Sequence, residues 1–198
     1  GTEELVLMKM NRLQKNWTFL NINTKTGKYT SGLTESDPNG WVQMHRNYHF
    51  LKNGNILWMS ERDGWHHIYI HAKDGSIINQ LTKGEWEVKR IVDVDEENQK
   101  VYFISNKETV FENRFYSVNF DGSDLSLLTE ESGMHSVRML PNKDGFIDSY
   151  SSIDTPTRHI LKDLNGKSIL VLKETNKSQF EAYDLSLIHI SEPTRRLR

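Results

Sequence analysis

The chain carries an internal repeat of about 47 residues, and that repeat limits the folds open to it. The dipeptide Leu-Thr recurs at Leu33, Leu81 and Leu128, spaced 48 and 47 residues apart. A turn that ends in glycine precedes each pair by the same distance, and a fourth such turn follows after a shorter step of 44 residues: Thr26-Gly27, Asp74-Gly75, Asp121-Gly122 and Asn165-Gly166. A fixed period in the forties with four strand-like runs indicates blades of a β-propeller.

The stretch from Asn53 to Val88 shows what one repeat contains. Short runs of β-branched and aromatic residues, such as Ile56–Met59, alternate with Asp-Gly or Asn-Gly turns, which is typical of consecutive β-hairpins. No run here has the length and spacing of an amphipathic helix. We therefore predict an all-β fold, a partial β-propeller of about three and a half four-stranded antiparallel blades. A single β-sandwich is the alternative, and it does not account for so constant a period.

The repeat also sets the expected domain organisation. We expect propeller blades over residues 1–173, beginning with the back half of a first blade, and a linker over 174–184. Residues 185–195 resemble a translated frame of a transposase sequencing adapter, so we expect 185–198 to be an adapter-derived tail without function. An open array exposes blade faces and strand edges, and we therefore expect residues 1–184 to be marginally stable or self-associating.

Composition excludes several classes of function. The 198 residues contain 25 Lys and Arg against 27 Asp and Glu, a net charge of −2 that does not favour nucleic acid or an anionic membrane. The chain has no cysteine, which excludes disulfides and thiol chemistry. It also has no apolar run long enough to span a membrane. The first residue is Gly1 rather than Met, so we expect a fragment.

Three histidines close together invite a metal-site hypothesis. Side chains alternate between the faces of a strand, so His67 and His71 would share one face and His66 the other. A zinc site needs three or four convergent ligands, and no carboxylate lies near them in the sequence. We predict hydrogen-bonded or solvated strand histidines and no metal.

The chain contains the residue types of a nucleophilic triad without the motif that would expose a nucleophile. Ser149, Ser151 and Ser152 occur among several His and Asp residues, but no Gly-x-Ser-x-Gly elbow is present. Glycine-rich phosphate loops are also missing. We predict no catalytic residue and no cofactor in this chain.

Four motifs appear in order along the chain. They are Met10–Gln14, Ser60–Tyr69 (Ser-Glu-Arg-Asp-Gly-Trp-His-His-Ile-Tyr), Gln80–Val88 (Gln-Leu-Thr-Lys-Gly-Glu-Trp-Glu-Val) and Asp148–Ser152. Together they closely resemble the propeller region of bacterial dipeptidyl peptidase IV-type serine peptidases of the prolyl oligopeptidase clan. The resemblance extends from about Glu4 to Lys173.

The resemblance implies an eight-bladed propeller followed by an α/β-hydrolase domain with a Ser-Asp-His triad. Such enzymes release N-terminal dipeptides, commonly after Pro or Ala, are often homodimers, and are periplasmic or secreted. Their propeller admits short or unfolded peptides and holds the substrate ammonium with a glutamate pair on an earlier blade. Glu96-Glu97 does not match that motif. The chain is expected to gate and position peptide substrate, with no activity alone and no nucleic-acid or membrane partner.

One loop is a candidate for substrate contact. In the family, the segment after Gly-Trp-Val can project toward the extended substrate pocket, and the matching positions here are Met44 and His45. An ordinary solvent-exposed connection is the alternative for this loop. For the chain as a whole, the alternative is a non-enzymatic β-propeller binding scaffold, since the fold hosts many functions. A relative that has lost its triad or releases tripeptides also stays open.

Overall fold

The chain folds into consecutive antiparallel sheets. The computed structural model describes residues 3–43, 47–153 and 155–175, in which all regular secondary structure is β-strand. The first sheet contains β1 (Glu4–Met10), β2 (Asn16–Asn23) and β3 (Tyr29–Ser36). The second contains β4 (Tyr48–Phe50), β5 (Ile56–Ser60), β6 (His67–His71) and β7 (Ile77–Gln80). The third contains β8 (Val88–Asp95), β9 (Lys100–Ser105), β10 (Arg114–Asn119) and β11 (Ser126–Leu127), and the fourth contains β12 (Met134–Met139), β13 (Gly145–Ser151), β14 (Arg158–Asp163) and β15 (Ser168–Glu174).

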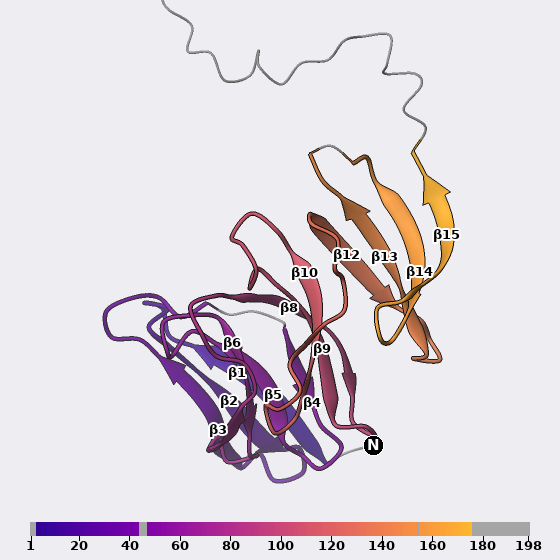
Figure 1. Cartoon of the computed structure of the whole chain (residues 1–198). Coiled ribbons are helices and arrows are strands. Elements are labelled where there is room, and N and C mark those ends of the chain that lie inside the picture. The colour runs from indigo at the N-terminus through magenta and orange to yellow at the C-terminus, as the bar shows by residue number, and fades with distance from the viewer. Residues whose placement is uncertain (1–2, 44–46, 154, 176–198) are drawn as a thin grey trace, which may run out of the picture.

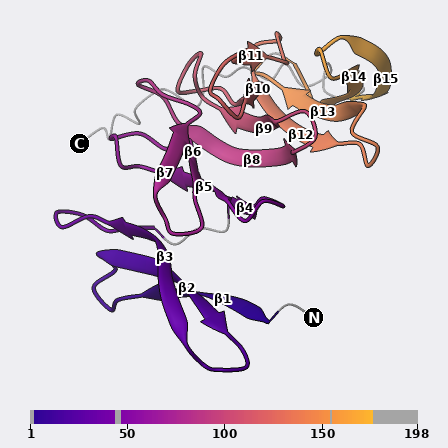
Figure 2. The ribbon, with the colours of Figure 1, turned by 90° about the horizontal axis from the view of Figure 1, so that it is seen from below.

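Each sheet is a meander whose strands pair in chain order, and the sheets follow one another in the same order (Figures 1 and 2). The predicted all-β partial propeller is thereby confirmed. The first sheet differs from the expected half blade because it has three strands, the third being β3. The residues Trp41-Val42 lie in the loop before β4.

Three apolar clusters hold neighbouring sheets together. Trp17 and Phe19 of the first sheet pack with Trp58 of the second. Met59 and Ile68 of the second sheet belong to the largest cluster, which also contains Phe103 of the third. The third and fourth sheets meet through Phe115 and Phe146, whose ring centroids lie 4.8 Å apart. These shared cores explain why every sheet buries both of its faces wherever it has a neighbour on each side.

The Leu-Thr repeat completes the outer edge of a sheet. The Leu81 N–H donates to the carbonyl of Ile68 at 2.8 Å, and the Thr82 hydroxyl accepts from the Ile68 N–H at 3.0 Å. Leu128 and Thr129 bond Phe115 in the same way, at 2.8 and 3.0 Å. The threonine hydroxyl therefore replaces a ladder partner where the short outer strand ends, which keeps a buried N–H satisfied.

The glycine turn of one sheet rests on the leucine of the preceding sheet, a contact that we call the inter-sheet latch. A Cβ atom on Gly75 would lie 2.7 Å from the Cα atom of Leu33, and one on Gly166 would lie 2.3 Å from the carbonyl oxygen of Leu128. Gly122 approaches Leu81 in the same way, at 3.4 Å from its carbonyl oxygen. The repeated glycine and leucine therefore mark the positions at which neighbouring sheets contact each other.

The two ends of the sheets differ. In a four-stranded meander the first strand begins, the middle hairpin turns and the last strand ends at one end, which we call the loop end. The loops there carry strongly exposed apolar side chains: Trp41, Val110, Phe111 and Ile153. The opposite ends are closed by short polar turns such as Asp74-Gly75. Among the described residues, the most exposed apolar side chains therefore lie at the loop end of the array.

Several predictions concern residues outside the described ranges. Met44 and His45 lie there, as do most of the predicted linker and the whole of the predicted tail. β15 ends at Glu174, one residue into the segment expected to be linker. Within the described ranges, no helix is long and apolar enough to cross a membrane.

Candidate functional site

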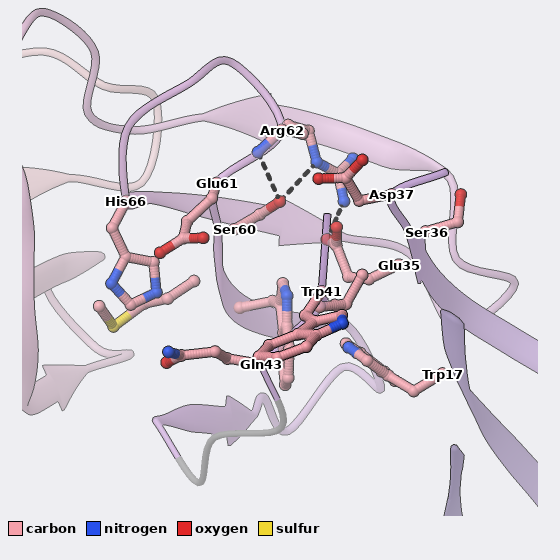
Figure 3. A pocket seen from close by; sticks show the side chains of 13 residues that line it. Trp17, Glu35, Ser36, Asp37, Trp41, Gln43, Ser60, Glu61, Arg62 and His66 are labelled. Atoms are coloured by element: carbon pink, nitrogen blue, oxygen red, sulfur yellow. Dashed lines mark hydrogen bonds and ion pairs between the residues drawn. The ribbon is translucent and has the colours of Figure 1, made fainter. Parts of the chain in front are cut away.

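A cavity of about 300 Å³ opens at the loop end, between the first and second sheets (Figure 3). Trp17 on β2 and Trp58 on β5 are buried beside it, with ring centroids 4.4 Å apart. Trp41, which is 77% exposed, lines it from the loop after β3. The indole Nε1 of Trp17 is buried and has no hydrogen-bond partner among the described residues. Three tryptophans therefore line the cavity together with several polar and charged side chains.

An arginine is fixed at the rim of this cavity. Arg62 forms an ion pair with Glu35, and its Nε donates to the Ser60 hydroxyl at 2.9 Å (Figure 3). Its guanidinium carbon also lies 5.0 Å from the centre of the Tyr69 ring. Because the planar guanidinium is held by several partners at once, it is pre-organised and little rotamer freedom remains to be lost on binding.

The cavity is acidic. Glu35, Asp37 and Glu61 contribute three carboxylates against the single guanidinium of Arg62. His66 also lines it, and burial lowers the pKa of that imidazole below its usual 6.5, which favours the neutral form near pH 7. Aromatic faces combined with carboxylates favour cationic or amide-bearing ligands such as peptides.

The structure describes some of the predicted candidate residues and not others. Met44 and His45 lie outside the described residues, while Gln43, the residue before them, lines the cavity. His67 and His71 are hydrogen-bonded strand histidines, as predicted. The His67 Nε2 donates to the Gly84 carbonyl, and the His71 Nδ1 donates to the Gly75 carbonyl, each at 2.9 Å. His66 lines the cavity, and among the described residues the three histidines form no group that could hold a metal ion.

A buried charge cluster in the fourth sheet was not predicted from the sequence. The His135 Nδ1 lies 2.9 Å from Asp148 Oδ1, and its Nε2 lies 2.8 Å from the carbonyl of Glu131. Both ring nitrogens of His135 therefore lie within hydrogen-bonding distance of an oxygen atom. The only sequence signal is that polar residues stand at positions where strands β12 and β13 are otherwise buried.

The Lys162 side chain belongs to the same cluster and lies between its two carboxylates. Glu131, His135 and Asp148 could together supply ligand atoms to a metal ion. The Lys162 ammonium, however, lies 2.6 Å from the Glu131 carboxylate and 3.3 Å from that of Asp148. It already provides a cation between the two carboxylates. We therefore describe the cluster as a structural ion network.

Ser149, one of the serines considered as nucleophiles, lies beside a histidine of the neighbouring strand. The Ser149 hydroxyl lies 2.8 Å from Nδ1 of His159, its cross-strand partner. Ser149 lies within strand β13 rather than at a tight turn, and within the described residues no carboxylate is bonded to His159. The pair lacks the exposed elbow and the orienting third group that a hydrolase triad uses.

Comparison with known proteins places this geometry in a family. Residues 1–157 match the family model of the dipeptidyl peptidase IV N-terminal region. The chain is 24% identical over 190 residues to the probable dipeptidyl peptidase 4 of Aspergillus flavus, covering 91% of this chain and 25% of that protein. It is 27% identical over 202 residues to dipeptidyl peptidase 4 of Trichophyton tonsurans, covering 97% and 26%. The chain spans about a quarter of the length of the curated relatives it matches.

Two solved structures have the same fold as this chain. The chain superposes on Porphyromonas gingivalis dipeptidyl peptidase 4 with a TM-score of 0.81 and 25% identity, covering 91% of this chain and 26% of that one. A putative dipeptidyl aminopeptidase IV from Bacteroides ovatus shares the fold, with a TM-score of 0.73 and 22% identity, over 88% of this chain and 28% of that one. The family match extends over most of the chain, through the first three sheets and the first two strands of the fourth. The chain belongs to the dipeptidyl peptidase IV N-terminal region family.

Proposed function

We propose that this chain is the part of a propeller that gates and positions peptide substrate for a serine exopeptidase, one that releases N-terminal Xaa-Pro or Xaa-Ala dipeptides. The observation that carries the proposal is the acidic, tryptophan-lined cavity at the loop end of a chain that belongs to this family. Reaction at the scissile carbonyl is the task of an α/β-hydrolase domain with its own triad. The chain alone is therefore inactive.

The loop end supports the gating part of the proposal. Exposed Val110, Phe111 and Ile153 lie in loops at that end, where a neighbouring domain would bury them. With the hydrolase domain there, the cavity faces the space between propeller and catalytic domain. Peptides reach the triad past these loops, and folded proteins are excluded by size. We also propose a homodimer and a periplasmic or secreted location for the complete enzyme, as the family resemblance implies.

The cavity supports the positioning part. Trp41 offers an exposed aromatic face, and Arg62 offers guanidinium hydrogens for a peptide carbonyl. The Trp17 Nε1 is a further donor without a partner among the described residues. Met44 and His45 follow Trp41 closely in the sequence, and we propose that they contact the same peptide.

The test uses a chimera in which residues 4–174 replace the matching segment of the Porphyromonas gingivalis enzyme. Trp41→Ala and Arg62→Ala should each raise the KM for a Gly-Pro chromogenic amide about tenfold and leave kcat unchanged, the result of removing uniform binding. Trp41 is largely exposed, so its loss should not disturb folding. Lys100→Ala is the control, because Lys100 pairs with Asp124 near the opposite end of the third sheet. Unchanged KM in both cavity variants would exclude the positioning role.

A further inference from the structure

The tryptophan-lined cavity between the first and second sheets contains two carboxylates that no described residue neutralises. The third carboxylate of the cavity, that of Glu35, is neutralised by its ion pair with Arg62. Asp37 accepts a hydrogen bond from the Asn39 N–H at 2.8 Å, and among the described residues neither Asp37 nor Glu61 forms an ion pair. Within the described part of the chain, the cavity therefore keeps two negative charges that a bound cation would offset.

These carboxylates are not arranged to hold an inorganic ion. A metal site needs ligand atoms that converge on one point. Among the described residues such a group occurs in the fourth sheet, as described above, and not in this cavity. Figure 3 shows Glu61 on the side of the cavity that carries His66, and Asp37 on the side that carries Glu35. Carboxylates on two sides of a cavity favour an extended organic cation.

Trp41 supplies a surface on which such a cation can rest. Its side chain is 77% exposed, and in the view of Figure 3 its ring lies between Glu61 and Asp37. The face of an indole ring attracts ammonium and guanidinium groups more strongly than the other aromatic side chains do. Lysine and arginine also have long apolar stems, which pack against a ring while the charged tip reaches a carboxylate.

The buried Trp17 points to a peptide rather than to a free amine. Its indole is fully buried, and its Nε1 has no hydrogen-bond partner among the described residues. An unsatisfied buried donor costs free energy, which a carbonyl oxygen of a bound ligand would recover. A free amine has no such acceptor. A peptide with a lysine or arginine residue supplies both the carbonyl and the cation.

We propose that the cavity selects peptides that carry a lysine or arginine side chain, held between the Trp41 ring and the carboxylates of Asp37 and Glu61. The inference rests on the positioning function proposed above and adds the charge of the residue that the cavity takes. An acidic side chain is disfavoured, because the Arg62 guanidinium is already bound by Glu35 and the two remaining carboxylates repel it.

Binding to the 198-residue chain tests the charge directly. The probes are Nα-acetylarginine methylamide and its citrulline counterpart, which has a neutral urea in place of the guanidinium and keeps both carbonyls. Titrations at fixed ionic strength, followed by tryptophan fluorescence, should give a dissociation constant about tenfold lower for the arginine probe. Glu61→Gln and Asp37→Asn should each reduce that ratio about threefold. Glu97→Gln, at an exposed glutamate in the β8–β9 turn, is the matched control and should keep it.

A second measurement uses the chimera defined above. Its substrates are pentapeptides with proline at the second position and either lysine or glutamine at one other position. At one of these positions, kcat/KM for dipeptide release should be about tenfold higher with lysine than with glutamine. Glu61→Lys should remove this preference, because it replaces a carboxylate of the cavity by a cation.

The outcomes separate this inference from the positioning function. Equal binding of the arginine and citrulline probes, or binding of neither, would overturn the inference whether or not the chimera is active. If Trp41→Ala and Arg62→Ala raise KM while lysine and glutamine peptides react equally at every position, the positioning function stands and the charge selection is wrong. Unchanged KM in both of those variants would overturn the two together.

Discussion

Gly75 and Leu33 lie in backbone contact across the first interface between sheets. A Cβ atom on Gly75 would be 2.7 Å from the Leu33 Cα atom, closer than real Cβ contacts come. The His71 Nδ1 donates to the Gly75 carbonyl and holds the turn in this position. The glycine is thus required twice, by its positive φ and by the space that the neighbouring sheet occupies.

Replacing this glycine should separate the two requirements. We expect Gly75→Ala to lower the free energy of unfolding by about 3 kcal/mol, from left-handed strain and from overpacking against Leu33. Gly54→Ala is the control, because Gly54 has φ of +86° and open space, so only the strain of about 1–2 kcal/mol applies. Urea unfolding monitored by tryptophan fluorescence measures both. Equal losses would show that the contact with Leu33 contributes nothing.

The threonine of the repeat should be needed for its hydroxyl. Thr129→Val removes the acceptor of the buried Phe115 N–H and should cost about 1–3 kcal/mol, the penalty for an unsatisfied buried donor. Thr129→Ser keeps the oxygen and should recover most of that loss. Thermal unfolding of the two variants gives the comparison, and a valine variant as stable as the serine variant would contradict the assigned bond.

The buried network in the fourth sheet should be sensitive to a neutral replacement. Asp148→Asn preserves the shape of the side chain but leaves the Lys162 ammonium and the His135 ring without their shared carboxylate. We expect a loss of about 3–5 kcal/mol, as for a broken buried ion pair. Asp124→Asn disrupts the exposed pair with Lys100 and should cost less than about 1 kcal/mol. Similar small losses in both variants would contradict the network.

Stability should fall as the pH drops below neutrality. Burial lowers the pKa of His71 below its usual 6.5, and its Nε2 is buried with no hydrogen-bond partner among the described residues. The unfolded chain therefore binds a proton more readily than the folded chain, so the free energy of unfolding decreases as the pH falls from about 7 to 5. His71→Gln should make this decrease shallower in denaturant titrations at the two pH values. An unchanged slope would show that His71 does not contribute.

The repeat made the fold predictable, and its physical basis explains why. The spacing of Leu33, Leu81 and Leu128 records a contact that every interface needs, so a single sequence was enough to predict the sheets and their order. The site was harder to predict from the sequence. Trp17, Glu35 and Arg62 are distant in sequence and meet only when the first two sheets pack together. The Asp148–Lys162 contact was missed for a related reason. Nothing in local periodicity distinguishes a buried, paired lysine from an exposed one.

The activity of the chain within a complete enzyme tests the central claim most directly. The measurement is release of dipeptide from a Gly-Pro chromogenic amide by the purified chain and by the chimera that carries residues 4–174 in the Porphyromonas gingivalis enzyme. We predict no turnover by the chain alone, and turnover by the chimera within about tenfold of the unmodified enzyme. A folded chimera without activity, or turnover by the isolated chain, would contradict the assignment of these sheets as the substrate-positioning part of a dipeptidyl peptidase.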